Sequence, residues 1–384
     1  MTDHPLSAVS LYIHLPWCLS KCPYCDFNSH ALKTSTLPEL DYTQALIDDL
    51  QLACADIKGR TVQSIFIGGG TPSLFSAKAI ERLLDACRKY TSLSSNCEVT
   101  LETNPGTFEY EKFKDFYTAG VNRLSIGVQS LNNDHLRTLG RVHSASEALQ
   151  AIHTAADIGF DNINIDMMFG LPEQTLTQAL VDIQQAVTQP IQHISYYQLT
   201  LEPNTIFHRY PPPLPDSDKL WEMQEQALIL LEEHGYQRYE VSAYARDGHY
   251  CQHNTGYWQY RDYLGIGAGA HTKLTLNGNI IRQQRIRQPD RYMQAVREHQ
   301  HIINRHQVSY DERVFEFMLN NLRLCEGFTL AHFQALTVLK WQDIEPTITK
   351  LTSQNLLLRD QTHIKASSLG YRFLDQITAK FLPE

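Results

Sequence analysis

The sequence lacks long apolar runs, an excess of positive charge and the cysteine density of a disulfide scaffold. No apolar stretch reaches the ~18 residues that a membrane-spanning helix needs. The chain does not open with a basic segment followed by an apolar core, so we expect no signal peptide. Lys and Arg number 33 against 42 Asp and Glu, and this net charge of −9 argues against a nucleic-acid partner.

Eight cysteines among 384 residues do not indicate a disulfide framework. Five are scattered and are expected to be small buried hydrophobic residues: Cys54, Cys87, Cys97, Cys251 and Cys325. This usage fits a reducing, cytoplasmic compartment. The length and the 42% of hydrophobic residues suffice for two domains with a sizeable core.

The other three cysteines, Cys18, Cys22 and Cys25, follow an apolar run at CxxxCxxC spacing. Thiolates bind soft metals and iron–sulfur clusters, and three of them in one loop can hold a cubane whose fourth iron stays open for chemistry. The alternatives are buried apolar thiols or a zinc site with His14 or His30 as fourth ligand. The spacing favours a 4Fe-4S cluster on the three cysteines.

Apolar runs that read as strands alternate six times with helical patterns over the first half of the chain. This alternation predicts an α/β fold with a parallel sheet, in the form of a partial, open (βα)6 barrel of the TIM-like kind. Functional side chains are then expected at the carboxyl ends of the strands. We expect strands at 8–14, 62–67, 98–102, 121–128, 162–168 and 193–199, and helices at 38–57, 71–87, around 113–116, 145–158, 176–187 and 216–234.

The pattern changes in the second half of the chain. A proline-rich connection at 203–215 is followed by the helix expected at 216–234 and then by a segment at 248–271 that lacks a helical period. Beyond about Arg282 we expect mostly helices and one small hairpin, a winged-helix-like arrangement. We therefore predict a core domain at 1–240 and a smaller, mostly helical C-terminal domain at 241–384, made of the connecting segment 248–271 and the helical region 282–384. The acidic chain argues against DNA contact, so a covering or interaction role is expected for it.

Polar and glycine-rich motifs fall where the expected strands end. Gly68-Gly69-Gly70-Thr71-Pro72 follows the second strand, and its glycines let the backbone approach a ligand closely. Glu102 and Asp166 end the third and fifth strands and could hold an amino group or ribose hydroxyls. Gln129 offers an amide, and Arg141 could pair with a carboxylate. Each alone is more often a solvated residue, but their placement at successive strand ends favours a common site.

The cysteine spacing, with an aromatic before the last cysteine, resembles the radical S-adenosylmethionine (radical SAM) superfamily, whose core is a partial (βα)6 barrel. The GGGTP motif and Ser125–Ser130, which reads SIGVQS, resemble the oxygen-independent coproporphyrinogen III oxidase family within it. The resemblance runs from about Val9 to His271 and implies that the open iron binds SAM. It assigns these SAM-binding positions, with Thr200 as a weaker one: Tyr12, Tyr24, Gly69, Gly70, Thr71, Glu102, Gln129, Arg141 and Asp166.

Two features depart from the oxidases of that family. Phe27 stands where they carry a fourth cysteine, and only a short segment precedes Cys18. The stretch from Cys25 to His30 and the HNxxYW motif at His253–Trp258 instead resemble a heme-chaperone branch of the family. His253 could ligate heme iron beside stacking aromatics, with His271 as the next candidate. The alternative is a structural turn with a hydrogen-bonded histidine and core aromatics.

The resemblance therefore implies a heme chaperone that carries a SAM-coordinated 4Fe-4S cluster, binds heme and passes it to an acceptor protein. The implied partners are that acceptor, an electron donor such as flavodoxin or ferredoxin, and a transient contact with a membrane protein. We assign no catalytic residue, and cleavage of SAM stays open. The alternatives are an oxygen-independent coproporphyrinogen III dehydrogenase, which decarboxylates its substrate, and a radical SAM enzyme with another substrate.

Overall fold

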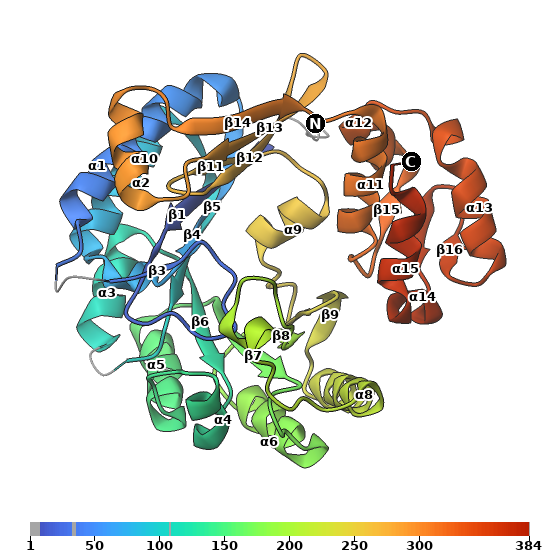
Figure 1. The fold of residues 1–384 in the computed structure, drawn as a ribbon, viewed down its shortest axis with the longest axis horizontal. Helices are drawn as coiled ribbons and strands as arrows, with labels where there is room; N and C mark the ends of the chain where they lie inside the picture. Colours follow the sequence, from blue (N-terminus) through green and yellow to red (C-terminus); the bar gives the residue numbers. More distant parts are fainter. Residues whose placement is uncertain (1–7, 33–35, 107–108, 384) are drawn as a thin grey trace.

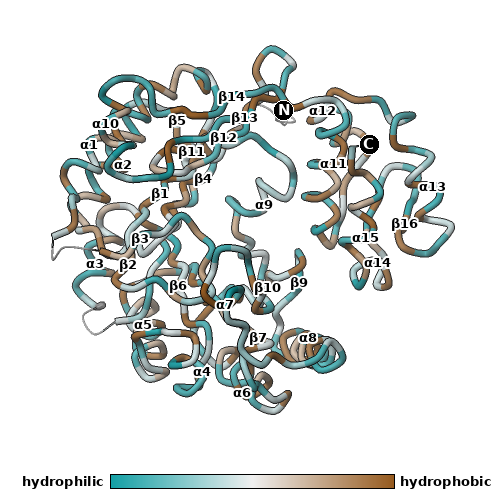
Figure 2. Tube along the Cα trace, viewed as in Figure 1, coloured by the Kyte–Doolittle hydropathy of each residue, from teal (hydrophilic) through white to brown (hydrophobic). Residues whose placement is uncertain are grey.

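The computed structural model describes residues 8–32, 36–106 and 109–383, and it is built around one twelve-stranded mixed sheet (Figure 1). The strand order is β14-β13-β12-β11-β1-β4-β5-β6-β7-β8-β10-β9. Hydrophobic segments lie along the central strands (Figure 2), because both of their faces are covered. No helix within the described ranges is both long and apolar enough to cross a membrane.

Six parallel strands follow the predicted order and confirm the partial (βα)6 barrel. They are β1 (Ala8–Leu15), β4 (Thr61–Gly69), β5 (Ser92–Thr103), β6 (Arg123–Gln129), β7 (Ile163–Phe169) and β8 (His193–Gln198). The connecting helices cover the outer face: α1 (Glu39–Ala53), continued by the 3-10 turn η1 (Cys54–Ile57), then α2 (Ala77–Tyr90), α3 (Glu109–Ala119), α4 (Asn133–Thr138), α5 (Ala145–Ile158), α6 (Leu176–Val187) and α8 (Ser217–Glu233). All carboxyl ends of these strands therefore meet at one edge of the barrel.

One helix start differs from the prediction. Residues Pro72–Leu74 form a separate 3-10 turn (η2), and α2 begins only at Ala77, where the Ser76 hydroxyl accepts a hydrogen bond from the Ala79 amide. The helix that the sequence predicted from residue 71 therefore begins six residues later. Thr71 makes no capping bond, and its hydroxyl accepts a hydrogen bond from the Asn104 side chain instead.

The segment 248–271, predicted without a regular helix, contains the short helix α9 (Gln252–Trp258) and the strand β11 (Tyr263–Ile266). β11 pairs parallel with β1 and so continues the sheet beyond the six predicted strands. Three antiparallel strands extend it further: β12 (His271–Leu276), β13 (Asn279–Arg285) and β14 (Ile302–Gln307). β9 (Gln237–Glu240) and β10 (Ala243–Ala245) complete the opposite end, and the boundary expected at residue 240 falls inside this sheet.

Buried charges attach this extension to the barrel. Asp49 in α1 accepts hydrogen bonds from Arg285 Nε at 2.7 Å and from the Tyr292 hydroxyl at 2.7 Å, and His301 Nε2 lies 3.0 Å away. Burial opposes ionisation of this carboxyl, but the Arg285 guanidinium holds its pKa well below the usual range. A buried charge that is paired in this way fixes α1, β13 and the helix α10 (Pro289–Arg297) in one arrangement.

The remaining residues form a smaller unit with its own hydrophobic cluster, centred on Phe317, Phe333 and Ile348. It appears as a separate lobe in Figure 1, and its predicted hairpin is present. Its helical stretches 341–353 and 368–381 are each divided into shorter elements by a turn. The elements are α11 (Tyr310–Asn321), β15 (Phe328–Thr329), α12 (Leu330–Thr337), η3 (Trp341–Asp343), α13 (Glu345–Ser353), β16 (Leu357–Arg359), β17 (His363–Ala366), α14 (Ser368–Arg372), α15 (Leu374–Thr378) and η4 (Ala379–Phe381).

Candidate functional site

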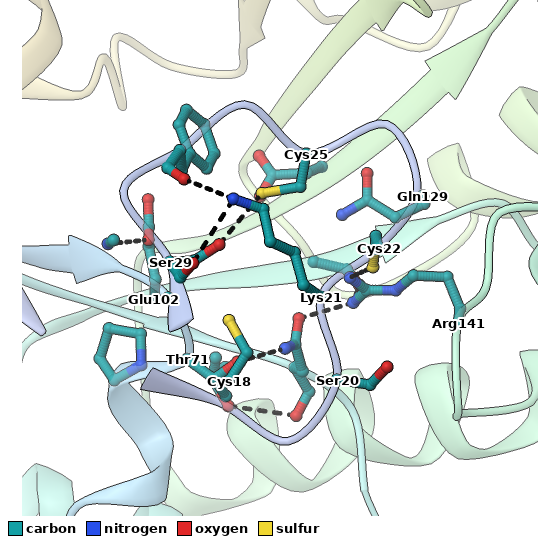
Figure 3. Close-up of a pocket in the computed structure, with 18 of the residues that line it drawn as sticks. Cys18, Ser20, Lys21, Cys22, Cys25, Ser29, Thr71, Glu102, Gln129 and Arg141 are labelled. Carbon is teal, nitrogen blue, oxygen red and sulfur yellow. Dashed lines mark hydrogen bonds between the residues drawn. The ribbon is translucent and has the colours of Figure 1, made fainter. Parts of the chain in front are cut away.

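The three-cysteine loop leaves the end of β1 and returns through a short parallel pair, β2 (Trp17–Cys18) with β3 (His30–Ala31). Cys18 is buried, whereas Cys22 and Cys25 are half-buried, and all three line one cavity of about 130 Å³ (Figure 3). Burial raises the pKa of the Cys18 thiol. A metal or cluster that binds Cys18 must therefore offset part of the free-energy cost of deprotonating this thiol.

The structure does not support His14 as a zinc ligand. Its Nε2 lies 2.9 Å from the Asn28 carbonyl oxygen and its Nδ1 lies 2.9 Å from the Tyr12 hydroxyl, so both ring nitrogens are engaged. Within the described ranges, no three His, Cys, Asp or Glu side chains converge as ligands of one ion. A cubane spreads its three cysteines over three different irons, so it does not require that convergence. The cysteine set fits a cluster better than a single ion.

The glycine motif forms the wall next to the cysteines. A β-carbon at Gly70 would lie 2.5 Å from the Trp17 carbonyl oxygen, so the backbone can approach the cysteine loop only because this residue is glycine. Gly69 has φ 121°, a conformation that glycine adopts readily. Its amide donates a 2.9 Å hydrogen bond to Glu102 Oε2, which aims this carboxyl at the cavity.

Arg141 crosses the cavity and joins the cysteine loop to the strand ends. Its Nη2 donates to the Asn104 side-chain oxygen at 2.6 Å and to the Gly127 carbonyl at 2.8 Å, while Nη1 lies 3.7 Å from Cys22 Sγ. On the far side, the Tyr197 hydroxyl donates a 2.8 Å hydrogen bond to Gln129 Oε1. These contacts hold donors and acceptors in fixed directions before any ligand binds.

Two carboxyls give the cavity its electrostatic character. Burial raises the pKa of Glu102 to about 7, with a further contribution from the negative charge of Asp166, although the Gly69 amide opposes the shift. Burial also raises the pKa of Asp166, against a hydrogen bond from Asn164. Two acids that are costly to ionise together favour a ligand that brings positive charge or several hydrogen-bond donors. SAM, with its sulfonium, amino group and ribose hydroxyls, meets that requirement.

The structure brings most of the expected SAM positions together around this one cavity. Tyr12 lines a neighbouring cavity, whereas Thr200 and His253 line neither. Sequence reasoning missed Asn104, Ser125 and Tyr197, which also line the first cavity. Asn104 lies just beyond an expected strand end and Tyr197 lies near one, and this position was the available signal. Ser125 lies in the middle of its expected strand. The positions placed together are Tyr24, Gly69, Gly70, Thr71, Glu102, Gln129, Arg141 and Asp166.

His253, which the motif offered as a heme ligand, is buried. It belongs to α9, is 1% exposed, and its Nδ1 lies 3.1 Å from the Ser64 hydroxyl. Burial lowers its pKa to about 3, so the imidazole is neutral. Its Nε2 has no hydrogen-bond partner in the described part of the chain. The buried Glu98 carboxylate accepts the amides of Gln252 and His253 and so anchors the start of the helix.

The barrel, the three-cysteine loop and the polar strand ends together define a radical SAM protein. The model of the Radical SAM superfamily matches residues 12–184, and the model of the HemN C-terminal domain matches residues 308–373. The chain belongs to the HemW family. It is 45% identical over 380 residues to heme chaperone HemW of Escherichia coli, and the alignment covers 99% of each chain.

Other relatives extend this similarity. Heme chaperone HemW of Haemophilus influenzae is 45% identical over 384 residues, covering 99% of both chains. Heme chaperone HemW of Bacillus subtilis is 32% identical, covering 98% of this chain and 99% of its own length. Among solved structures, the coproporphyrinogen III oxidase HemN of Escherichia coli superposes with a TM-score of 0.83 over 99% of this chain and 91% of its own, at 21% identity. That likeness shows the fold.

Proposed function

We propose that this protein is a heme chaperone that binds heme, holds a SAM-coordinated 4Fe-4S cluster and passes heme to an acceptor protein. The observation that carries the proposal is the 45% identity to a heme chaperone over 99% of both chains. Phe27 adds support, because it lies 62% exposed at the cavity edge where the oxidases of the wider family carry a fourth cysteine. An exposed phenyl ring offers apolar contact area to a flat ligand.

In this proposal Cys18, Cys22 and Cys25 hold the cluster through their thiolates. When bound, a reduced cluster of this type supplies an electron to the SAM sulfonium. Glu102 and Asp166 accept hydrogen bonds from the amino group and ribose, and Arg141 pairs with the SAM carboxylate. Gly70 keeps the backbone close enough to the ligand. The remaining contacts come from Tyr12, Tyr24, Gly69, Thr71 and Gln129.

The proposal includes partners and a place of work. The acceptor is a heme-binding protein, reached in some cases through transient contact with a membrane protein, and an electron donor such as flavodoxin or ferredoxin reduces the cluster. We place the chain in the reducing cytoplasm, because the proposed cluster thiols function only when reduced.

The test is anaerobic reconstitution of the full chain with iron and sulfide, followed by two assays on the same preparation. Heme titration read by the Soret band should show saturable binding, and transfer to an apo heme protein should follow. Incubation with coproporphyrinogen III, SAM and a reductant should leave the substrate unconsumed. Robust formation of protoporphyrinogen, or no saturable heme binding, would overturn the proposal.

A further inference from the structure

A second cavity, of about 460 Å³, opens directly beside the SAM site. The two cavities share Phe27, Gly69 and Glu102, so a ligand in the second would lie next to a SAM molecule in the first. The cysteine loop forms part of the partition. Asn28 of this loop donates hydrogen bonds of 2.8 and 2.9 Å to the carbonyls of Ala268 and Arg287, which ties the loop to the opposite wall.

The walls of this cavity offer flat aromatic area. Tyr257 and Tyr263 pack edge to face with ring centroids 4.4 Å apart, and Tyr12 lines the same space. Phe27 projects at the rim shared with the SAM site. Several rings around a cavity of this size fit a flat, mostly apolar ligand whose polar groups are at its edge. A porphyrin has this shape, with propionates along one edge.

His271 and Arg287 supply the two polar contacts that heme needs. His271 begins β12 and is exposed into the cavity, and within the described residues no hydrogen bond occupies its ring nitrogens. Partial burial and the neighbouring charges of Arg282, Arg287 and Arg285 lower its pKa, so its imidazole is neutral near pH 7 and can donate a lone pair to iron. The exposed Arg287 guanidinium lines the same cavity and suits a propionate.

His253 is positioned differently. It does not line the cavity, but it contacts two residues that do, with its ring centroid 4.7 Å from Tyr257 and 6.2 Å from Tyr12. Its ring stacks on Phe66 with centroids 5.0 Å apart. In this arrangement the HNxxYW motif presents Tyr257 to the ligand, and His253 supports that tyrosine from within the protein.

We propose that heme binds in this second cavity with His271 as an axial ligand, Tyr257 and Phe27 as flat contacts, and Arg287 paired with a propionate. The inference rests on the proposed heme-chaperone function and adds the place and the ligand. His253 is a positioning residue that acts on heme through the two tyrosines it contacts, Tyr257 and Tyr12. Heme would then lie beside the SAM site, with the Asn28 hydrogen bonds linking the two.

The experiment is a hemin titration of the anaerobically reconstituted full chain, with the Soret maximum, the low-spin bands and the dissociation constant measured together. His271→Ala should weaken binding by about tenfold or more and remove the imidazole-ligated spectrum, and added imidazole should restore it. Arg287→Gln should weaken binding by about tenfold without moving the Soret maximum, because it removes only a charged contact. His306→Ala, an exposed histidine on β14 outside the cavity, is the matched control and should match the wild type.

His253→Phe, which keeps a ring against Tyr257, separates the two histidines. We expect it to keep the imidazole-ligated spectrum. A normal spectrum in His271→Ala, or loss of the imidazole-ligated spectrum in His253→Phe but not in His271→Ala, would overturn the assignment while leaving the chaperone function standing. If the wild type itself fails to bind hemin saturably, the proposed function fails, and this site fails with it. Circular dichroism on each variant identifies any loss of binding that comes from misfolding.

Discussion

Replacing Glu102 by glutamine tests the electrostatics of the SAM site most directly. The glutamine oxygen can still accept the hydrogen bond from the Gly69 amide, so the strand end keeps its conformation, and only the charge and one acceptor are lost. A hydrogen bond to a charged group is worth about 1.5–3 kcal/mol. At pH 8, where the carboxylate of the wild type is mostly ionised, the variant should therefore bind SAM about 10 to 150 times more weakly.

The pH dependence gives a second, independent signature. The pKa of Glu102 lies at about 7, and the ionised form is the better partner for amino or ribose donors. Because SAM binding favours the ionised form, affinity should be highest above pH 7 and decline as the carboxyl becomes protonated below it. Between pH 8 and pH 6 the affinity of the wild type should fall about tenfold, a decline that Glu102→Gln lacks.

Calorimetry on the anaerobically reconstituted protein, repeated at several pH values, measures both effects. Any protonation of SAM itself affects both proteins equally. The ratio of their dissociation constants for SAM therefore reports only the contribution of Glu102. Asp182→Asn is the matched control. Burial raises the pKa of this carboxyl to about 6, and it accepts hydrogen bonds from Ser130 and Leu131 outside the SAM cavity. Equal affinities, or parallel pH profiles, for wild type and Glu102→Gln would refute this account.

Three further predictions concern the cluster, the SAM site and stability. Replacing Cys18, Cys22 and Cys25 together by alanine should abolish binding of about four irons per chain after reconstitution, measured by iron and sulfide analysis; unchanged iron content would contradict the ligand assignment. Asp166→Ala should weaken SAM binding by about 1.5–3 kcal/mol in the same calorimetry, and an unchanged affinity would remove this residue from the site. Asp49→Ala leaves the buried Arg285 charge without its carboxylate, so denaturant unfolding should show a loss of about 3–5 kcal/mol, against about 0.5 kcal/mol or less for the neighbouring Asp48→Ala. A loss for Asp49→Ala no larger than that of Asp48→Ala would contradict the role of this ion pair.

Local sequence patterns were sufficient to predict the first half of the fold. Each βα unit buries a continuous apolar strand under a helix with an apolar face, and both features have their own period within the sequence. The bounds of α5 and α6 match the expectation for this reason. In the second half of the sequence, the hydrophobic periodicity that indicates helices and strands is weaker. Only His253 and Gly256 of α9 are buried, so that helix has no apolar period. β13 has two adjacent isoleucines followed by four polar residues, so it lacks the alternation of a typical strand.

The grouping of most expected SAM and cluster residues around one cavity could be predicted, because it depends on residues close in sequence and on one geometric rule. Three cysteines within eight positions must share a loop, and polar residues toward the carboxyl ends of parallel strands come together on one side of the barrel. Glu102 lies one residue before the end of β5, whereas Asp166, which was expected at a strand end, lies three residues before the end of β7. Tyr197 escaped notice because its role depends on a hydrogen bond to Gln129, which lies 68 residues earlier in the chain.

The sequence alone determined the cysteine loop, the six βα units and the set of strand-end residues, since each of these follows from short-range spacing and periodicity. Only the tertiary structure decided that β11 pairs with β1, that Asp49 meets Arg285 across 236 residues, and that His253 is buried while His271 faces a cavity. These outcomes depend on which distant segments come into contact. Burial and charge pairing are properties of that contact, because desolvation and Coulomb attraction act on neighbours in space.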